Sequence, residues 1–94
     1  MRIYKWSLQD TALQTLILPL GAQILTVQMQ NDHPQLWALC EDQAVLTQPG
    51  QIRTIAIYET GSSLPDNPGA YIGTFQMQQG AVVCHVFAVG EEKP

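Results

Sequence analysis

The feature that most constrains the fold is a period-two alternation that recurs along almost the whole chain. Apolar and polar residues alternate in short runs, and Gly, Pro or Asn-Asp pairs interrupt the runs. In residues 25–30, for example, Leu25, Val27 and Met29 fall on one face and the polar residues fall on the other. Helical periodicity is weak throughout. The pattern predicts half-buried β-strands.

Seven runs are predicted to be strands, and one of them, residues 35–41, is nearly all apolar, which predicts a strand covered on both sides. The predicted strands are residues 2–8, 13–20, 22–30, 35–41, 52–58, 71–78 and 81–89. The segment 31–34 predicts a tight turn, because Asn and Asp tolerate left-handed backbone and Pro34 cannot extend a ladder. Gln79-Gly80 predicts a two-residue hairpin turn, and 42–51 a hairpin or loose connection. We therefore expect an all-β fold, a compact antiparallel sandwich or partly open barrel.

The length bounds the domain organisation. With 94 residues, 46% of them hydrophobic, the chain can form one core. We expect a single β domain over residues 1–94 with a frayed, charged tail at 89–94. No run approaches the roughly 18 apolar residues of a membrane span, and residues 1–10 lack the apolar core of an export signal. A cytoplasmic location without a membrane partner follows as the expectation.

The charge composition also narrows the partners. Only 13% of residues are charged, four basic against eight acidic, and the net charge is −4. Nucleic-acid polymers are bound through basic clusters, and the sequence has none, so we expect no DNA or RNA partner. A sparsely charged surface repels copies of itself weakly, which favours a homo-oligomer.

The two cysteines, Cys40 and Cys84, each lie inside an apolar run. A reduced thiol in such a run behaves as a small buried hydrophobe, so we predict two free, buried thiols. A metal site requires several ligands at close spacing, and the sequence has no such spacing. We expect no metal and no other cofactor.

The longest interruption of the strand pattern is residues 59–70, rich in Gly, Ser, Pro and Asn. A hairpin turn needs only two to five residues. The segment is therefore either a crossover between strands or a binding loop. As a binding loop, Thr60, Gly61, Ser62 and Ser63 offer backbone N–H groups and hydroxyls that can form a nest for phosphate or carboxylate.

The other candidate ligand contacts lie on strands. Arg53 is a candidate cation, but it begins the strand that leads to the loop, roughly 20 Å away, and would reach a ligand there from a neighbouring subunit. His85 is either a core or interface histidine or a hydrogen-bond donor to a ligand. Tyr58, Tyr71 and Trp6 are expected to be half exposed, with ring faces able to stack on a nucleobase.

Signals for catalysis are weak. The loop serines lack a nucleophile-elbow motif, and Glu59 and Asp66 flank the loop without further support for a carboxylate-pair hydrolase. His33 is expected to be an exposed turn residue. A nucleotide-cleaving enzyme with His85 or His33 as base is the third-ranked hypothesis, and we expect no catalysis.

Five segments carry a resemblance in order along the chain. They are "RIYKWSL", "LPLGAQILTVQMQN", "LWAL", "YETG" followed by Pro65, and "YIGTFQMQQGAVVCHVF". From Arg2 to Val89 the chain thereby resembles a family of small uncharacterised proteins from tailed phages and prophages. The loop of that family reads Gly-Thr-Gly-His-Pro; here Thr60-Gly61 is kept and serines stand where the histidine would be.

The resemblance implies an accessory phage protein acting in the cytoplasm of an infected host cell. Such proteins often neutralise a host component, and one class forms compact oligomers that sequester nucleotide immune signals at subunit interfaces. We therefore predict a non-catalytic protein that sequesters a small nucleotide-type ligand at an oligomer interface. The alternative is an interaction module that adds its sheet edge to a host or virion protein. The predicted ligand contacts are Thr60, Gly61, Ser62, Ser63, Tyr58, Tyr71, Trp6, Arg53 and His85.

Overall fold

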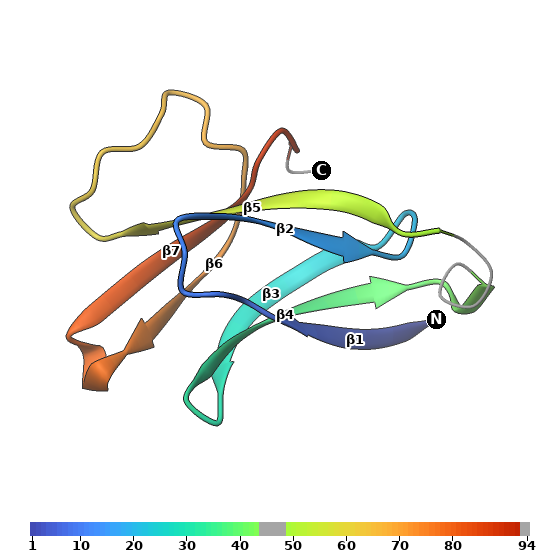
Figure 1. The fold of residues 1–94 in the computed structure, drawn as a ribbon, viewed down its shortest axis with the longest axis horizontal. Coiled ribbons are helices and arrows are strands. Elements are labelled where there is room, and N and C mark those ends of the chain that lie inside the picture. Colours follow the sequence, from blue (N-terminus) through green and yellow to red (C-terminus); the bar gives the residue numbers. More distant parts are fainter. Residues whose placement is uncertain (44–48, 93–94) are drawn as a thin grey trace.

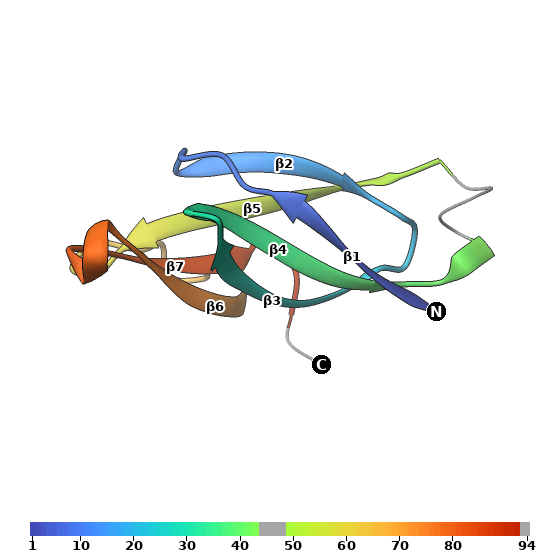
Figure 2. The same ribbon diagram turned by 90° about the horizontal axis from the view of Figure 1, so that it is seen from below.

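The computed structural model describes residues 1–43 and 49–92, which form two packed antiparallel sheets (Figures 1 and 2). The elements are β1 (Arg2–Ser7), β2 (Leu13–Leu18), β3 (Gln23–Gln30), β4 (His33–Cys40), β5 (Gln51–Glu59), β6 (Ala70–Met77), η1 (Gln78–Gly80) and β7 (Val82–Ala88). The all-β prediction is confirmed, and the sheets form a sandwich that does not close into a barrel. Part of the predicted 42–51 connection, residues 44–48, lies outside the described residues.

One sheet has the order β1-β4-β3 and the other the order β2-β5-β7-β6. β3 and β6 pack side by side, and Figure 2 shows them together at the lower margin with β2 at the upper margin. Gly73 permits this approach, because a Cβ atom there would lie 3.1 Å from Val27 Cγ2. The described residues contain no helix of the length and apolarity that a membrane crossing needs.

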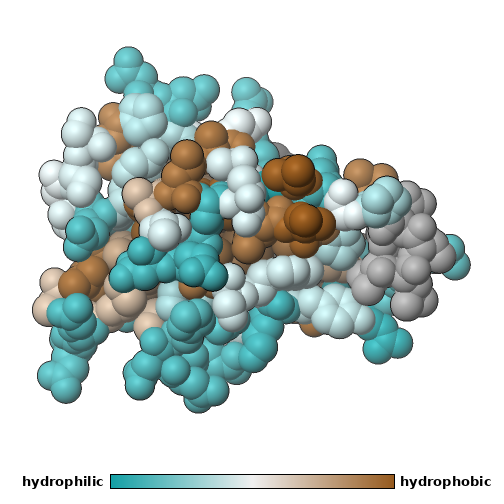
Figure 3. All heavy atoms as spheres, in the orientation of Figure 1, coloured by the Kyte–Doolittle hydropathy of each residue, from teal (hydrophilic) through white to brown (hydrophobic). Residues whose placement is uncertain are grey.

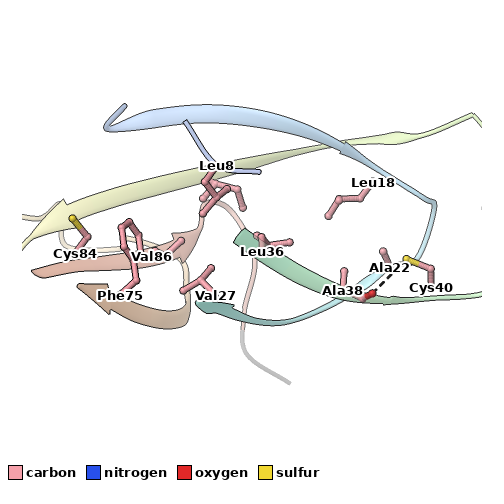
Figure 4. Packing of buried hydrophobic residues seen from close by; sticks show 11 residues of the cluster. Leu8, Leu18, Ala22, Val27, Leu36, Ala38, Cys40, Phe75, Cys84 and Val86 are labelled. Atoms are coloured by element: carbon pink, nitrogen blue, oxygen red, sulfur yellow. Dashed lines mark hydrogen bonds between the residues drawn. The ribbon is translucent and has the colours of Figure 1, made fainter. Parts of the chain in front are cut away.

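The core lies between the sheets and draws on both (Figure 4). Cys40 and Cys84 are buried, free thiols, as predicted, and lie toward opposite ends of the core. Burying each large aliphatic side chain stabilises the fold by about 1.5–3 kcal/mol. The largest fully buried side chains are Leu8, Leu18, Leu36, Ile55, Val27, Val86 and Cys40.

The inward face of β3 differs from the prediction. Val27 is buried and Met29 packs against the core, but Leu25 is 40% exposed and Ile24 packs inward in its place. The reason is a β-bulge, seen as a shift in the pairing with β4 between Ile24 and Thr26. One extra residue reverses the alternation on one side of the bulge.

The first hairpin turn is tighter than predicted. Residues 31–32 alone form it, with φ of 53° and 62°, and His33 and Pro34 belong to β4. In a two-residue hairpin Gln30 and His33 are a hydrogen-bonded pair, so Pro34 faces Met29 at a non-hydrogen-bonded position. β3 needs no N–H there, and the proline fits into the strand.

The second hairpin turn is the predicted two-residue turn, with Gln79 and Gly80 at its centre. The Ala81 N–H donates to the Gln78 carbonyl (3.1 Å), and Gln79 and Gly80 take φ of 58° and 89°. Gln78 beside the turn also takes a positive φ, of 53°, and the ladder pairing ends at Met77 and Val82. The register between β6 and β7 is the one that this turn implies.

Candidate functional site

The candidate site is built on the outer face of the four-stranded sheet. β7 buries Cys84 and Val86 at alternate positions, so His85 and Phe87 point away from the core. β7 is an inner strand, with β5 and β6 on its two sides. Side chains on it are held by neighbours on both flanks and have fixed positions.

The strand register brings polar and aromatic residues next to these two side chains. His85 is paired with Tyr58 on β5 and with Thr74 on β6. Phe87 is paired with Tyr71 on β6. Side chains directly opposite on one face lie about 4.5–5.5 Å apart at Cβ. Two adjacent rows across three strands therefore form one continuous patch.

A second β-bulge is needed for this patch. Tyr71 and Thr74 are three residues apart and in a regular strand would point to opposite faces. The pairing of β6 with β7 shifts between Tyr71 and Gly73, and the extra residue puts both side chains outward. Their hydroxyl groups consequently meet in a hydrogen bond.

Four polar side chains form a connected hydrogen-bonded chain on this face. The Val83 carbonyl only accepts, so the Thr60 hydroxyl donates to it (3.5 Å) and accepts from His85 Nε2–H (2.7 Å). In this neutral tautomer His85 Nδ1 accepts from the Thr74 hydroxyl (3.0 Å). The Thr74 hydroxyl in turn accepts from Tyr71. All of these directions follow from the Val83 carbonyl, which stands at the end of the chain and can only accept a hydrogen bond.

Three aromatic rings lie beside this chain. The ring of Phe87 meets Tyr58 edge-on at a centroid distance of 6.0 Å and Tyr71 at 5.4 Å. Tyr71 is 44% exposed, while the other two rings are half-buried. We name the six residues the outer-face cluster: Tyr58, Thr60, Tyr71, Thr74, His85 and Phe87.

The 59–70 segment is a crossover. It leaves β5, passes the end of β7 and enters β6, and Figure 1 shows it as a wide excursion. The Thr60 N–H donates to the Val83 carbonyl and the Ser62 N–H to the Glu59 carbonyl, both at 3.0 Å. Two of the four predicted nest amides are thus used within the protein. Of the predicted loop contacts, Thr60 joins the outer-face cluster, while Gly61 and Ser63 are exposed.

Arg53 lies on the inner side of β5, away from the loop. Its guanidinium donates to both carboxylate oxygens of Glu91 (2.7 and 2.5 Å) and to the Ala22 carbonyl (2.9 Å). Glu91 belongs to the tail that was predicted to be frayed. Two interactions hold the described part of this tail: the ion pair with Arg53, and a hydrogen bond from the Val89 N–H to the Thr54 carbonyl. Arg53 and Tyr71 both border a hollow of about 370 Å³.

Trp6 is a predicted contact that lies outside the cluster. It belongs to β1 in the other sheet and packs, half-buried, against the core. His33, the alternative base, is exposed at the start of β4, also in the other sheet. The structure therefore unites Tyr58, Thr60, Tyr71 and His85. Arg53 shares only the hollow beside Tyr71, and Trp6 lies in the other sheet.

A second hollow, of about 420 Å³, opens at the end of β5 where Tyr58 and Ser62 border it. Asp10, Glu59 and Cys84 line it as well. Burial raises the pKa of the Cys84 thiol, and the charges of Glu59 and Asp10 raise it further. The same two carboxylates repel anions, so this hollow does not favour a phosphate.

Thr74 and Phe87 are cluster members that the sequence did not single out. The predicted hairpin register already places Thr74 opposite His85, so strand pairing was the available signal. Within residues 1–43 and 49–92, no three His, Cys, Asp or Glu side chains gather as a metal-ligand set.

Fold and site together define a small two-sheet β-sandwich protein with a polar and aromatic cluster on one outer face. The chain belongs to the family described as "Domain of unknown function (DUF7352)", whose match covers residues 1–94. Neither the curated proteins nor the solved structures contain a match to this chain.

Proposed function

We propose that this protein binds and sequesters a small nucleotide-type ligand on the outer-face cluster, without turnover. The observation that carries the proposal is the hydrogen-bonded chain through His85 lying directly beside the exposed ring of Tyr71. A nucleobase needs a ring on which to stack and polar groups at its edge, and this patch offers both. The six residues come from one chain, so the proposed contacts do not require a second subunit.

Charge decides which part of the ligand is recognised. In the described chain the basic side chains are engaged elsewhere: Arg2 with Asp42, Lys5 with Gln30, and Arg53 with Glu91. A phosphate at the cluster gains no cation from these groups, and the nearby Glu59 repels it. We therefore expect recognition of the base and sugar, with phosphates directed into solvent.

The bonding of His85 supports binding over catalysis. A general base needs a ring nitrogen whose lone pair reaches the substrate. Both ring nitrogens of His85 already bond to threonine hydroxyls, at 2.7 and 3.0 Å. The imidazole is thereby oriented as a fixed part of the surface.

Calorimetric titration with adenosine, AMP and ADP-ribose tests the proposal. We expect the three affinities to agree within about threefold, because phosphates contribute little, and the ligand to be recovered intact by mass spectrometry. Tyr71→Ala should weaken binding by about 5- to 150-fold, the loss expected for one stacked base.

Tyr4→Ala is the matched control, since Tyr4 is similarly exposed (40%) but belongs to the other sheet. Its binding should equal that of the wild type. Equal effects of the two substitutions, or no binding of any of the three compounds, would contradict the proposed site. An altered ligand would contradict the absence of turnover.

A further inference from the structure

The outer edge of β2 carries free backbone hydrogen-bonding groups. β2 pairs with β5, and no other described strand pairs with it. The Ile57 N–H donates to the Ala12 carbonyl (2.9 Å), which fixes the phase of this antiparallel ladder. Every second residue of β2 from Leu13 onward, namely Leu13, Thr15 and Ile17, therefore directs its N–H and C=O away from β5. The Thr11 hydroxyl reaches one of these groups, the Leu13 carbonyl, in a long 3.5 Å bond.

This edge lacks the devices that usually prevent strand addition. Residues 11–30 contain no charged side chain, and β2 contains neither proline nor bulge. The edge of β1, by contrast, has Lys5 among its outward-directed residues. The remaining edges, β3 and β6, each contain a bulge and pack against each other. β2 is the unprotected edge of the described fold.

Apolar side chains line the same edge on the outer face. Leu13 is 64% exposed, Ile17 66% and Ile52, the cross-strand neighbour of Ile17, 70%. Figure 3 shows strongly hydrophobic spheres over β2 and the adjoining part of β5. A partner strand placed along β2 would cover this row.

We propose that the partner is a second copy of this chain, paired antiparallel through β2 about a twofold axis at Thr15. In this register Leu13 faces Ile17 of the second copy, and Thr15 faces its own counterpart. All three outward-directed residues then pair by backbone hydrogen bonds, apolar opposite apolar and hydroxyl opposite hydroxyl. The absence of charge on β2 means that the twofold brings no like charges together.

Neighbouring registers fit worse. A shift of the axis to Gln14 sets Leu13 against Thr15 and Ile17 against Thr11. A shift to Leu16 sets Leu13 against Pro19, which has no N–H to donate. The backbone phase and the side-chain pattern thus select one twofold register.

The dimer contains one eight-stranded sheet with the two outer-face clusters on the same side. Five strand spacings separate the two copies of β7, roughly 24 Å, so each cluster remains separate. The inference therefore goes beyond the proposed ligand binding and does not depend on it. One edge contact is a small interface, so we expect a weak dimer whose population depends on protein concentration.

Sedimentation velocity of the whole chain from about 1 to 200 µM tests the inference. We expect a monomer–dimer equilibrium in the wild type. Thr15→Lys should weaken the dimer by at least about tenfold, because two ammonium groups meet at the axis. Thr15→Glu should do the same, and an equimolar mixture of the two variants should recover the dimer. The matched control is Ser7→Lys on the β1 edge, which should leave the equilibrium unchanged.

Far-UV circular dichroism verifies that each variant is folded. Thr15→Cys offers a second readout, since residues facing each other in a hydrogen-bonded pair lie about 5.5 Å apart at Cα, within disulfide range. It should crosslink under mild oxidation much faster than Ile17→Cys, which faces Leu13. A monomer throughout the concentration range, a dimer indifferent to Thr15→Lys, or equal crosslinking of the two cysteine variants would each overturn the proposal.

Discussion

The outer faces of the two sheets carry polar side chains arranged in different ways. On the three-stranded sheet they bond in separate pairs: Lys5 with Gln30, and Ser7 with Gln35. On the four-stranded sheet they form one connected chain through His85, beside three aromatic rings. Separate pairs satisfy a surface locally, whereas a connected chain orients several groups at once. This difference is the reason for proposing the ligand site on the four-stranded sheet.

The largest loss of stability is expected for a substitution at Gly69, where the crossover enters the four-stranded sheet. A Cβ atom on Gly69 would lie 2.2 Å from the Ala88 carbonyl oxygen, and its φ is +106°. Gly69→Ala should therefore lower the free energy of unfolding by about 2–6 kcal/mol, from backbone strain and overpacking together. Urea denaturation measures this loss.

Gly61→Ala is the control, because Gly61 has a similar φ of +91° but open space around its Cβ position. Only the strain remains there, about 1–3 kcal/mol. Equal losses in both variants would show that the crossover is not anchored against β7.

The next effect compares an arginine from each sheet. Arg53 is 11% exposed and holds Glu91 and the Ala22 carbonyl, whereas Arg2 is 68% exposed in its pair with Asp42. Arg53→Met should cost about 1.5–3 kcal/mol of unfolding free energy. Arg2→Met should change it by less than about 0.5 kcal/mol. Thermal and urea unfolding of both variants provide the comparison. A larger loss in Arg2→Met than in Arg53→Met would contradict a stabilising role for the Arg53–Glu91 pair.

A smaller effect is expected for the coupling energy between residues of the outer-face cluster. In a double-mutant cycle, Thr60→Val and Thr74→Val should couple by about 0.5–1 kcal/mol through His85. The corresponding cycle of Lys5→Met and Gln30→Met tests an isolated, exposed pair, for which we expect less than about 0.5 kcal/mol. If the effects of the two threonine substitutions were additive, the two hydrogen bonds of His85 would be independent and the chain would not act as a unit.

The smallest effect concerns the two buried thiols, one from each sheet. Burial raises the pKa of Cys40 and of Cys84 above the ordinary value of 9.0, and Glu59 and Asp10 add to the shift at Cys84. Below pH 9 both thiols are protonated in the folded and unfolded chains. As the pH rises through 9, the unfolded chain releases its thiol protons first, so the free energy of unfolding decreases.

Urea unfolding between pH 8 and 10 measures this decrease, with Cys84→Ala and Cys40→Ala as the variants that remove each contribution. The alkaline loss should shrink in both, and more in Cys84→Ala because of the added carboxylates. An unchanged pH dependence in Cys84→Ala would contradict the assignment of the alkaline loss of stability to the Cys84 thiol.

The strands were predictable because their alternation is local. The shared face of His85 and Phe87, and the half exposure of Tyr58, follow from period two alone. That His85 points outward was left open by the sequence, and the burial of Cys84 and Val86 between the sheets decides it. The bulges did not follow, because they arise from pairing with a strand elsewhere in the chain. One bulge exposes Leu25, and the other joins Tyr71 to Thr74.

The long-range partners were also beyond local reading. Arg53 and Glu91 are 38 residues apart and meet only once β5 and the tail are placed. Likewise, the insertion of β7 between β5 and β6 decides that the 59–70 segment is a crossover. Topology therefore fixed which candidate residues share a site, while composition indicated only their chemical types.

The most direct test of the proposed function is an amide NMR titration of the ¹⁵N-labelled chain with adenosine. The account predicts shifts confined to the four-stranded sheet, around Tyr58–Thr60, Tyr71–Thr74 and His85–Phe87, with the amides of β1, β3 and β4 unchanged. Shifts centred on the three-stranded sheet, or none at saturating adenosine, would contradict it.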